Sequence, residues 1–235
     1  METTEQAPKQ SKRRWVVIGL FLVILVIGVV ATVSLRSSPA TLPAGPEGVE
    51  LSKAPDLAPA SSTLHGEPVG PIQCVTESQE KVGFHTHTYV AVFVDGEQRR
   101  IPGGVGITQP WLAEKFPTGT YFEVGPYNCL YWIHTHTADN IVHVEAPSKG
   151  IFTLGQLFAV WNQPLSSTQV GPAKGKVVVI VNGKRAAGDI TTVPLTDQAT
   201  IQINVGDQVV PFEPKTFKVT GQCGQGTKSC KTPIK

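Results

Sequence analysis

The sequence predicts an α+β protein, mostly antiparallel β and sandwich- or barrel-like, with one packed α-helix behind a single N-terminal transmembrane helix. Three observations lead to this class: an uncharged apolar stretch near the start, two strand–turn–strand patterns and one amphipathic segment. The chain has 235 residues, which is enough for one sizeable domain and additional segments. We expect the domain at residues 72–235.

The first part of the chain is expected to anchor it in a membrane. Residues 15–33 read WVVIGLFLVILVIGVVATV, nineteen residues without a charge, about the length that crosses a hydrocarbon core. Four basic residues precede them: Lys9, Lys12, Arg13 and Arg14. By the positive-inside rule, residues 1–14 stay in the cytoplasm, residues 15–35 form the anchor, and the remainder of this single-pass protein is extracytoplasmic.

A cleaved signal peptide is the alternative interpretation of the apolar stretch. Ala31 and Val33 could form a poor cleavage site. The apolar core of a signal peptide is usually shorter, about 7–15 residues, so the uncleaved anchor is favoured.

Residues 36–71 are predicted to form a tether between the anchor and the domain. They contain seven prolines and show no periodic apolar pattern. Proline-rich segments of this kind are extended and semi-rigid, so the tether would hold the domain away from the membrane surface.

Two segments of the domain carry the pattern of a strand, a tight turn and a returning strand. They read TYVAVFVDGEQRRIP and KVVVIVNGKRAAG. Asp95-Gly96 and Asn182-Gly183 favour type I′ turns, because both central residues of such a turn need positive φ. A third segment, ATIQINVG at 199–206, alternates apolar and polar residues as a half-buried strand does.

One helix is predicted at about residues 153–163, within FTLGQLFAVWNQP. Thr153 can cap its start, and Gln156 three positions later completes a capping box. Four residues then form one apolar stripe at helical spacing: Leu154, Leu157, Phe158 and Trp161. We expect the helix to pack on the sheet with Trp161 in the core, and to end before Pro164.

Four cysteines lie outside the expected membrane segment, where an oxidising compartment favours disulfides. Three pairings are possible in principle. Proximity in the sequence favours Cys223 with Cys230, which leaves Cys74 with Cys129.

Five of the six histidines fall in two short windows. FHTHTYVAVFVDG holds His85 and His87, while YWIHTHTADNIVHVE holds His134, His136 and His143. The sixth histidine, in the tether at position 65, has no such neighbours, and we expect no role for it.

The second window can place its polar side chains on one side of a hairpin. If residues 130–146 turn tightly at 139–140, residue 136 faces 143 and residue 134 faces 145. The members of that side are then His134, His136, His143 and Glu145. The opposite side carries the core residues Tyr131, Ile133, Val142 and Val144. A slip of the register by one residue would separate the cluster.

A neighbouring strand with His85 and His87 would complete a cluster of five imidazoles around one point. Imidazole suits copper, zinc and iron, whereas five buried neutral histidines without a metal would each need hydrogen-bond partners. The predicted ligands are therefore His85, His87, His134, His136 and His143. Glu145 would be a further ligand or would orient a ligand ring. A solvated, metal-free strand face is the alternative.

The segments HTHTYVAVFVDG, IPGGVGI and CLYWIHTHTADNIVHVEAPSKGIFTLGQLFAVW together resemble a family of uncharacterised, often membrane-anchored prokaryotic extracytoplasmic proteins. Its members carry H-x-H, HTH, IHxE and TLGxFF-VW elements, and the resemblance runs from about residue 74 to 206. Thr137 stands where an aspartate is common in the family. The resemblance implies that the histidines act as one unit, but it brings no established activity.

The function favoured by these patterns is metal handling or delivery by a membrane-tethered extracytoplasmic protein, with copper as the first choice and zinc or iron as alternatives. Divalent copper has the highest intrinsic affinity for nitrogen ligands. The net charge of +2 and the 16% of charged residues argue against a nucleic-acid partner. A protein partner is not identified by any motif.

Three other functions remain open on the sequence. A histidine-ligated metalloenzyme could act on a small redox substrate, although no nucleophile or nucleotide-binding motif is present. A blue-copper site could use Cys129 and His134, but no methionine follows them. A β-domain without a metal could recognise a protein partner.

Overall fold

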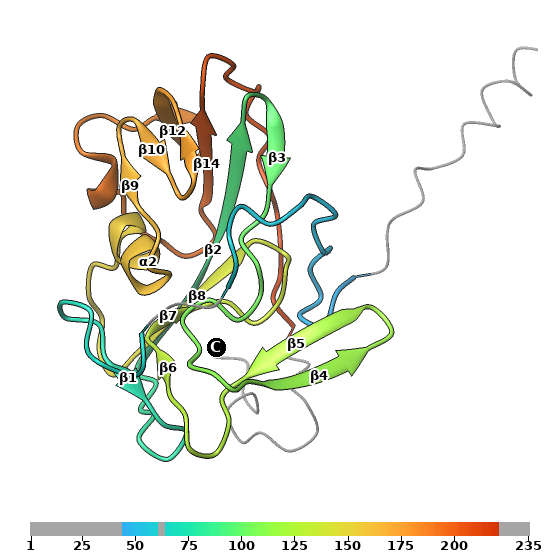
Figure 1. Ribbon diagram of the computed structural model, residues 1–235, viewed down its shortest axis with the longest axis vertical. Coiled ribbons are helices and arrows are strands. Elements are labelled where there is room, and N and C mark those ends of the chain that lie inside the picture. Colours follow the sequence, from blue (N-terminus) through green and yellow to red (C-terminus); the bar gives the residue numbers. More distant parts are fainter. Residues whose placement is uncertain (1–43, 61–63, 221–235) are drawn as a thin grey trace, which may run out of the picture. The chain divides into compact units, whose positions relative to one another are not determined.

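The computed structural model describes residues 44–60 and 64–220, and its largest element is a seven-stranded mixed sheet (Figure 1). The strands follow the order β13–β12–β14–β2–β8–β7, and β3 also pairs with β2. Their bounds are β2 Phe84–Val94, β3 Glu97–Arg99, β7 Ile133–His134, β8 Ile141–Ala146, β12 Val177–Val181, β13 Lys184–Arg185 and β14 Thr200–Val205. Among the described strands of this sheet, β14 and β2 are the one pair that runs in parallel, so the predicted mostly antiparallel β class is confirmed.

Smaller sheets surround this one. Their strands are β1 Cys74–Val75 with β6 Leu130–Tyr131, β4 Leu112–Phe116 with β5 Gly119–Glu123, and β9 Leu165–Ser166, β10 Gln169–Val170 and β11 Ala173–Lys174. The main sheet runs from edge strand β13 to edge strand β7 without closing into a barrel. Among the described residues, a helix rather than a second large sheet packs on it.

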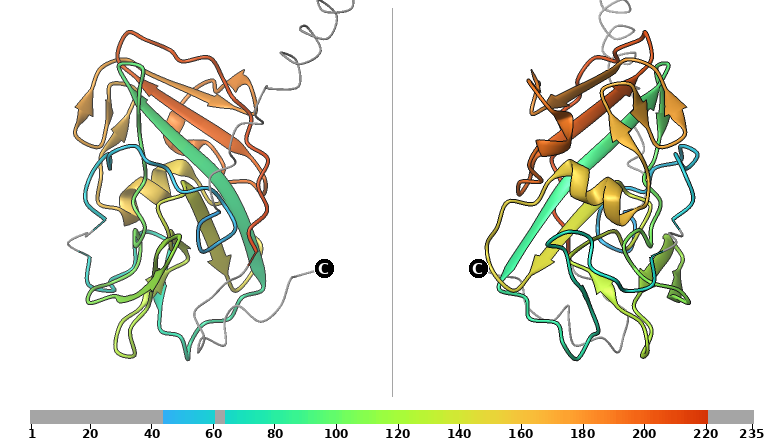
Figure 2. Two further views of the ribbon diagram at one scale, coloured as in Figure 1. Left: turned by 90° about the vertical axis from the view of Figure 1, so that its right-hand side faces the viewer. Right: turned by 60° about the vertical axis from the view of Figure 1, so that its left-hand side comes forward.

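The long strand β2 sends its side chains alternately to the two faces of the main sheet, and Figure 2 shows how it crosses the fold beside β14. Val90 and Val92 belong to the main core, together with the apolar side chains of α2 (Leu154–Val160). Tyr89 and Ala91 lie on the other face and pack near Phe217 in a smaller core. Both faces of β2 are therefore covered.

Helix α2 begins as the sequence predicts. The side chain of Thr153 accepts from the Gln156 backbone N–H, and the Gln156 side chain accepts from the Thr153 backbone N–H. The helix is shorter than predicted because Asn162 takes a left-handed φ of 56° directly after Trp161, the C-cap residue. Trp161 is fully buried and donates from Nε1 to the Pro59 carbonyl, so its predicted core position is confirmed.

The two predicted type I′ turns are present. Asp95 and Gly96 have φ values of 49° and 83°, and Asn182 and Gly183 have φ values of 48° and 82°. These turns join β2 to β3 and β12 to β13.

Strand β14 differs from the prediction, because it is buried on both faces rather than half-buried. A C-terminal segment covers its polar side. Gln202 donates to the Val210 carbonyl, and Thr200 Oγ1 accepts from the Lys215 backbone N–H. The alternation in the sequence was correct, but a polar strand face can be covered by backbone groups that satisfy its hydrogen bonds.

The domain begins earlier than residue 72. Leu57 and Ala58 are buried in the main core, and Asp56 forms a bridge with Arg100. Glu47 is only 3% exposed. Residues 44–60 are therefore part of the folded domain and not of an extended tether, which corrects the boundary expected from the proline content.

Several predictions lie outside the described residues. They concern the cytoplasmic residues 1–14, the anchor at 15–35, the start of the tether, and the cysteines at positions 223 and 230. Within the described part of the chain, no helix is long and apolar enough to cross a membrane.

Candidate metal centre

Three adjacent strands bring the predicted ligands together. In the order β2–β8–β7, strand β8 lies in the middle. His143 on β8 pairs with His87 on one side and with His134 on the other. His85 pairs with Glu145 two residues further along the same two strands, β2 and β8. These side chains therefore form two rows on the sheet face opposite α2.

The register of β7 against β8 differs by two residues from the predicted one. His134 faces His143, whereas the sequence placed His136 there and paired His134 with Glu145. The connection at 135–140 is wide rather than a tight two-residue turn. Because strand side chains alternate with a period of two, a shift of two residues keeps the same side chains on the same face.

A glycine-rich loop shapes the segment that carries His134 and His136. Thr135 between them forms hydrogen bonds with residues 102–105 through both its side chain and its backbone. An added Cβ on Gly103 would lie 2.8 Å from the His136 carbonyl oxygen, and one on Gly106 would lie 2.4 Å from the Ile133 carbonyl oxygen. This close approach explains the glycines of IPGGVGI, which hold Thr135 inward so that the two flanking histidines point the other way.

The rings of His134 and His136 face one another through their Nε2 atoms, which lie 3.1 Å apart. Nδ1 of His134 lies 2.9 Å from the Tyr131 carbonyl oxygen, and Nδ1 of His136 lies 2.7 Å from the Phe122 carbonyl oxygen. A carbonyl oxygen only accepts hydrogen bonds, so each Nδ1 carries the hydrogen. A neutral imidazole has one N–H, so in the neutral form of both rings the two Nε2 atoms direct lone pairs toward each other.

Two lone pairs at this distance repel unless a proton or a metal ion lies between them. Burial, together with the neighbouring His136, lowers the pKa of His134 to about 3, which opposes a second proton on that ring at neutral pH. Two nitrogens bound to one ion at about 2.0–2.1 Å, at angles of about 90–110°, lie about 2.9–3.4 Å apart. An Nδ1–H group bonded to a backbone carbonyl is also the usual orientation of a metal-binding histidine.

Two carboxylates border these rings. Oε1 of Glu47 lies 2.9 Å from His143 Nε2, and Oε1 of Glu145 lies 2.9 Å from His85 Nε2 and 3.8 Å from His143 Nδ1. Both contacts at 2.9 Å are close, yet neither has the alignment of a hydrogen bond. Nitrogens near an acceptor but not directed at it fit a set of ligands arranged around a shared ion.

The charge of each buried group in the centre depends on its charged neighbours. Burial alone would raise the pKa of Glu47, but the adjacent His143 lowers it to about 2. Burial alone would lower the pKa of His143, but Glu47 and Glu145 raise it to about 10. Burial, with the charges of its histidine neighbours, lowers the pKa of His87 to about 2. At neutral pH the His143 ring is therefore an imidazolium between two carboxylates.

The histidines divide into two groups that share one member. Ligand atoms of His134, His136, His143 and Glu145 all lie within 4.8 Å of one another, and so do those of His85, His87 and His143. The predicted single shell of five imidazoles is therefore two adjacent groups joined at His143. The histidine at position 65 is exposed and belongs to neither.

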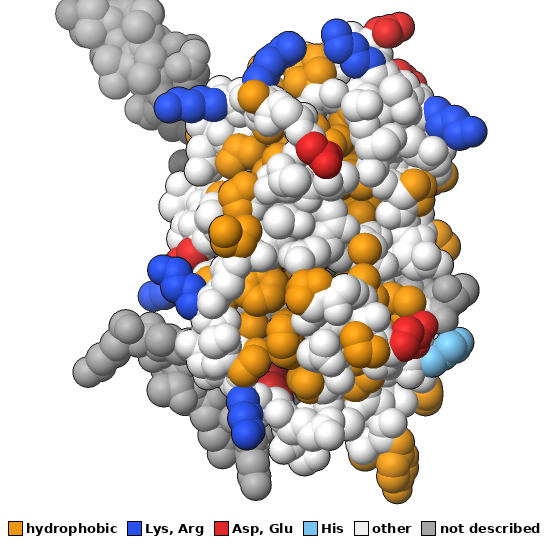
Figure 3. All heavy atoms as spheres, turned by 90° about the vertical axis from the view of Figure 1, so that its left-hand side faces the viewer, with side chains coloured by type: hydrophobic (Ala, Val, Ile, Leu, Met, Phe, Trp, Pro, Cys, Tyr) orange, Lys and Arg blue, Asp and Glu red, His pale blue; other side chains and the backbone are white. Residues whose placement is uncertain are grey.

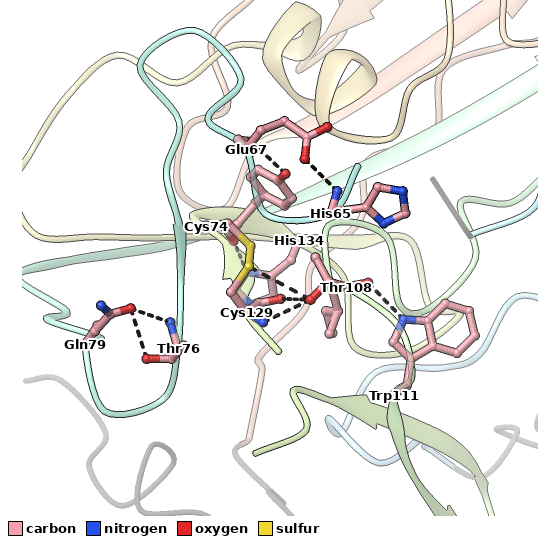
Figure 4. Close-up of a disulfide and its surroundings, with 11 residues drawn as sticks. His65, Glu67, Cys74, Thr76, Gln79, Thr108, Trp111, Cys129 and His134 are labelled. Atoms are coloured by element: carbon pink, nitrogen blue, oxygen red, sulfur yellow. Dashed lines mark hydrogen bonds between the residues drawn. A yellow bond between two sulfur atoms is a disulfide. The ribbon is translucent and has the colours of Figure 1, made fainter. Parts of the chain in front are cut away.

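The disulfide predicted between Cys74 and Cys129 is present and links β1 to the segment before β6. Figure 4 shows it with Thr108 and His134 nearby; Thr108 Oγ1 donates to the Cys129 carbonyl. Because this sulfur is bonded to Cys74, Cys129 is not a thiolate ligand, and the blue-copper alternative loses its sulfur.

Three residues of the centre were missed by the sequence analysis, and the first two are Glu47 and Tyr121. Glu47 lies in the proline-rich stretch and had no feature to separate it from the exposed Glu50 nearby. Tyr121 on β5 stacks on the ring of His136, with centroids 4.5 Å apart and planes 8° apart. The alternation of GTYFE could have indicated a buried Tyr121, but not its partner.

A third missed residue is Asp139, which is 1% exposed. Its Oδ1 accepts from the Ile141 backbone N–H at 2.9 Å. Burial and the charge of Glu47 raise the pKa of Asp139 well above its usual value. The sequence analysis assigned this residue only to a turn.

The group around His134 and His136 is enclosed, whereas His85 and His87 are partly exposed. His134, His136 and His143 are at most 5% exposed. Figure 3 shows the opposite side of the molecule, the α2 side, where many hydrophobic side chains lie at the surface. The arrangement thus provides nitrogen and carboxylate ligands in a buried site.

Comparison with known proteins gives no assignment: no family model, no curated protein and no solved structure matches this chain.

Proposed function

We propose that the protein binds a divalent transition-metal ion through His134, His136, His143 and Glu145. The observation that carries the proposal is the 3.1 Å approach of two Nε2 atoms whose Nδ1 atoms are both directed at backbone carbonyls. A metal ion beside both nitrogens removes the repulsion of their lone pairs. A solvated histidine face would leave these nitrogens free to bond water, which their burial opposes.

Copper is the first candidate, and zinc or iron are the alternatives. The ligands are imidazole nitrogens and a carboxylate, which suit Cu(II), Zn(II) and Fe(II). The chain has a single methionine, at position 1, and the two described cysteines form a disulfide, so soft ligands for Cu(I) are lacking in the described part. Among these divalent ions, copper has the highest intrinsic affinity for such a site.

The proposed setting is the outer side of a membrane, where the protein would handle or deliver its metal. The uncharged stretch at 15–33 and the basic residues before it support a membrane anchor. The disulfide supports an oxidising compartment.

Titration of the purified full-length chain tests this function. After removal of metal with a chelator, Cu(II), Zn(II) and Fe(II) are added separately, and bound metal is measured by elemental analysis after desalting. We expect tight binding, with Cu(II) the tightest, and loss of most of the affinity of this site in His136→Ala and His143→Ala. His65→Ala is the matched control and should bind as the unaltered chain does. A folded His134→Ala/His136→Ala/His143→Ala variant with unchanged binding would refute the site.

A further inference from the structure

More ligands converge on this sheet face than one ion uses. Five imidazoles and the carboxylates of Glu47 and Glu145 lie within one connected cluster. A protein-bound zinc ion takes about four ligands, and a tetragonal copper site takes a similar number. The group around His134 and His136 already supplies three imidazoles and one carboxylate, which leaves His85 and His87 in excess.

His85 and His87 each have a buried ring nitrogen without an aligned hydrogen bond. Nε2 of His87 is buried and has no hydrogen-bond partner. Nε2 of His85 is buried too and lies 2.9 Å from Glu145 Oε1 without the alignment of a hydrogen bond. The two rings lie 4.5 Å apart between centroids, which is close to the 4.7 Å between the rings of His134 and His136.

His143 stands between the two groups. Its neighbours across the strands are His87 on β2 and His134 on β7, and its ring centroid lies 4.6 Å and 5.4 Å from theirs. Both of its nitrogens are buried without an aligned hydrogen bond. Only a ring that has lost both N–H protons has an in-plane lone pair on each nitrogen, so His143 can serve two ions only as an imidazolate, through Nδ1 on one side and Nε2 on the other.

We propose that the centre holds two transition-metal ions, one beside His134 and His136 and one beside His85 and His87, with His143 as the ligand between them. The proposal rests on the proposed metal-binding function and extends it to a paired site. When His143 bridges two ions, its ring gives up its protons to solvent, and Glu145, which reaches toward both groups, supplies negative charge to the pair.

Copper stoichiometry and magnetic coupling test the proposal. The full-length chain is titrated with Cu(II), bound copper is counted by elemental analysis after desalting, and the electron paramagnetic resonance signal is integrated. We expect two copper ions per chain. The integrated signal per copper should be lower at two equivalents than at one, because neighbouring spins couple through the shared imidazole.

Two matched double variants separate the groups. His85→Ala/His87→Ala and His134→Ala/His136→Ala should each bind one copper per chain, with a full uncoupled signal. One copper in the unaltered chain, or two in His85→Ala/His87→Ala, would overturn the paired site and leave the single-site function standing. No bound copper, zinc or iron in the unaltered chain would overturn both. Where a variant loses its strand-dominated circular dichroism, the count and signal of the unaltered chain decide.

Discussion

The two faces of strands β2, β8 and β7 are formed by alternate residues of the same backbone, yet one face buries apolar side chains and the other buries polar ones. On the α2 side, Ile133, Val142 and Val144 are fully buried in the main core. On the other side, the adjacent residues His134 and His143 are buried among imidazoles and carboxylates. One face gains free energy by burying apolar area, whereas the other buries polar groups at a cost that only a ligand offsets.

This difference indicates what each face contributes. The apolar face should determine the stability of the fold with or without metal. The histidine face should contribute little to the stability of the metal-free protein, because its lone pairs face each other, and should stabilise the protein only once an ion is bound.

The largest expected effect comes from removal of the Cys74–Cys129 disulfide, which should lower the stability of the metal-free and the metal-loaded protein equally. The bridge closes a loop with a sequence separation of 55. Chain-entropy arithmetic for such a loop gives about 4 kcal/mol of stabilisation. We expect Cys74→Ala/Cys129→Ala to lower the free energy of unfolding by about that amount in urea denaturation, with or without metal. A loss confined to the metal-loaded form would contradict this shared role.

Substitutions of the neighbouring residues Ile133 and His134 on β7 distinguish the contributions of the two faces to stability. Ile133→Ala should destabilise the metal-free protein by about 2–5 kcal/mol, because it leaves a cavity in the main core. His134→Ala should leave the metal-free stability nearly unchanged but reduce the stabilisation that added Cu(II) gives, because the ion beside His134 and His136 loses a ligand. Thermal unfolding of both variants with and without Cu(II) measures this. Equal destabilisation of the two metal-free variants would show that the faces do not differ as described.

A smaller effect is expected at Glu145, which lies within reach of both His85 and His143. Glu145→Gln keeps the shape of the side chain but removes its charge. We expect metal affinity to fall at least about 10–100-fold, the range for residues that only support metal ligands, because Glu145 is itself a proposed ligand. Competition against a chelator of known affinity measures the change, and Glu50→Gln, at an exposed position, is the control.

The smallest expected effect is the number of protons released when Cu(II) binds. The pKa of His143 is raised to about 10, above the ordinary histidine value of about 6.5, so the ring is protonated at pH 7.5 and must lose a proton to bind metal. The first equivalent of Cu(II) should therefore release about one proton, measured by calorimetry in buffers of different ionisation enthalpy. Glu47→Gln removes a carboxylate that raises this pKa and should reduce the release. Release that is unchanged in this variant would exclude His143 as the source.

The same pKa values set opposite trends for the stability of the metal-free protein. His87 has a pKa of about 2, so the unfolded chain takes up its proton more readily, and stability from this residue falls as pH drops below about 6.5. His143 has a raised pKa, so its contribution is fully present below about 6.5 and is lost as pH rises toward 10.

The parts of the fold that follow from local pattern were predictable. The two type I′ turns, the capping box at Thr153 and the pairing of Cys74 with Cys129 depend on residues close in sequence or on elimination among few alternatives. The shared face of His134 and His143 was also predictable, because alternation survives an error of two residues in register.

The remaining features depend on contacts that no local pattern encodes. Glu47 reaches His143 from a proline-rich stretch 96 positions earlier, and nothing in that stretch distinguishes a packed segment from an extended one. The register of β7 depends on how Gly103 and Gly106 pack against the wide connection. The division into two ligand groups depends on β8 lying between β2 and β7, which is a property of the strand order.

Anomalous X-ray diffraction from crystals of the metal-loaded protein, collected at the copper absorption edge, tests the central claim most directly. We predict a peak within about 2.0–2.2 Å of Nε2 of both His134 and His136. Absence of a peak there at full copper loading, or a peak held instead by surface groups such as His65, would contradict the assignment of this sheet face as a metal centre.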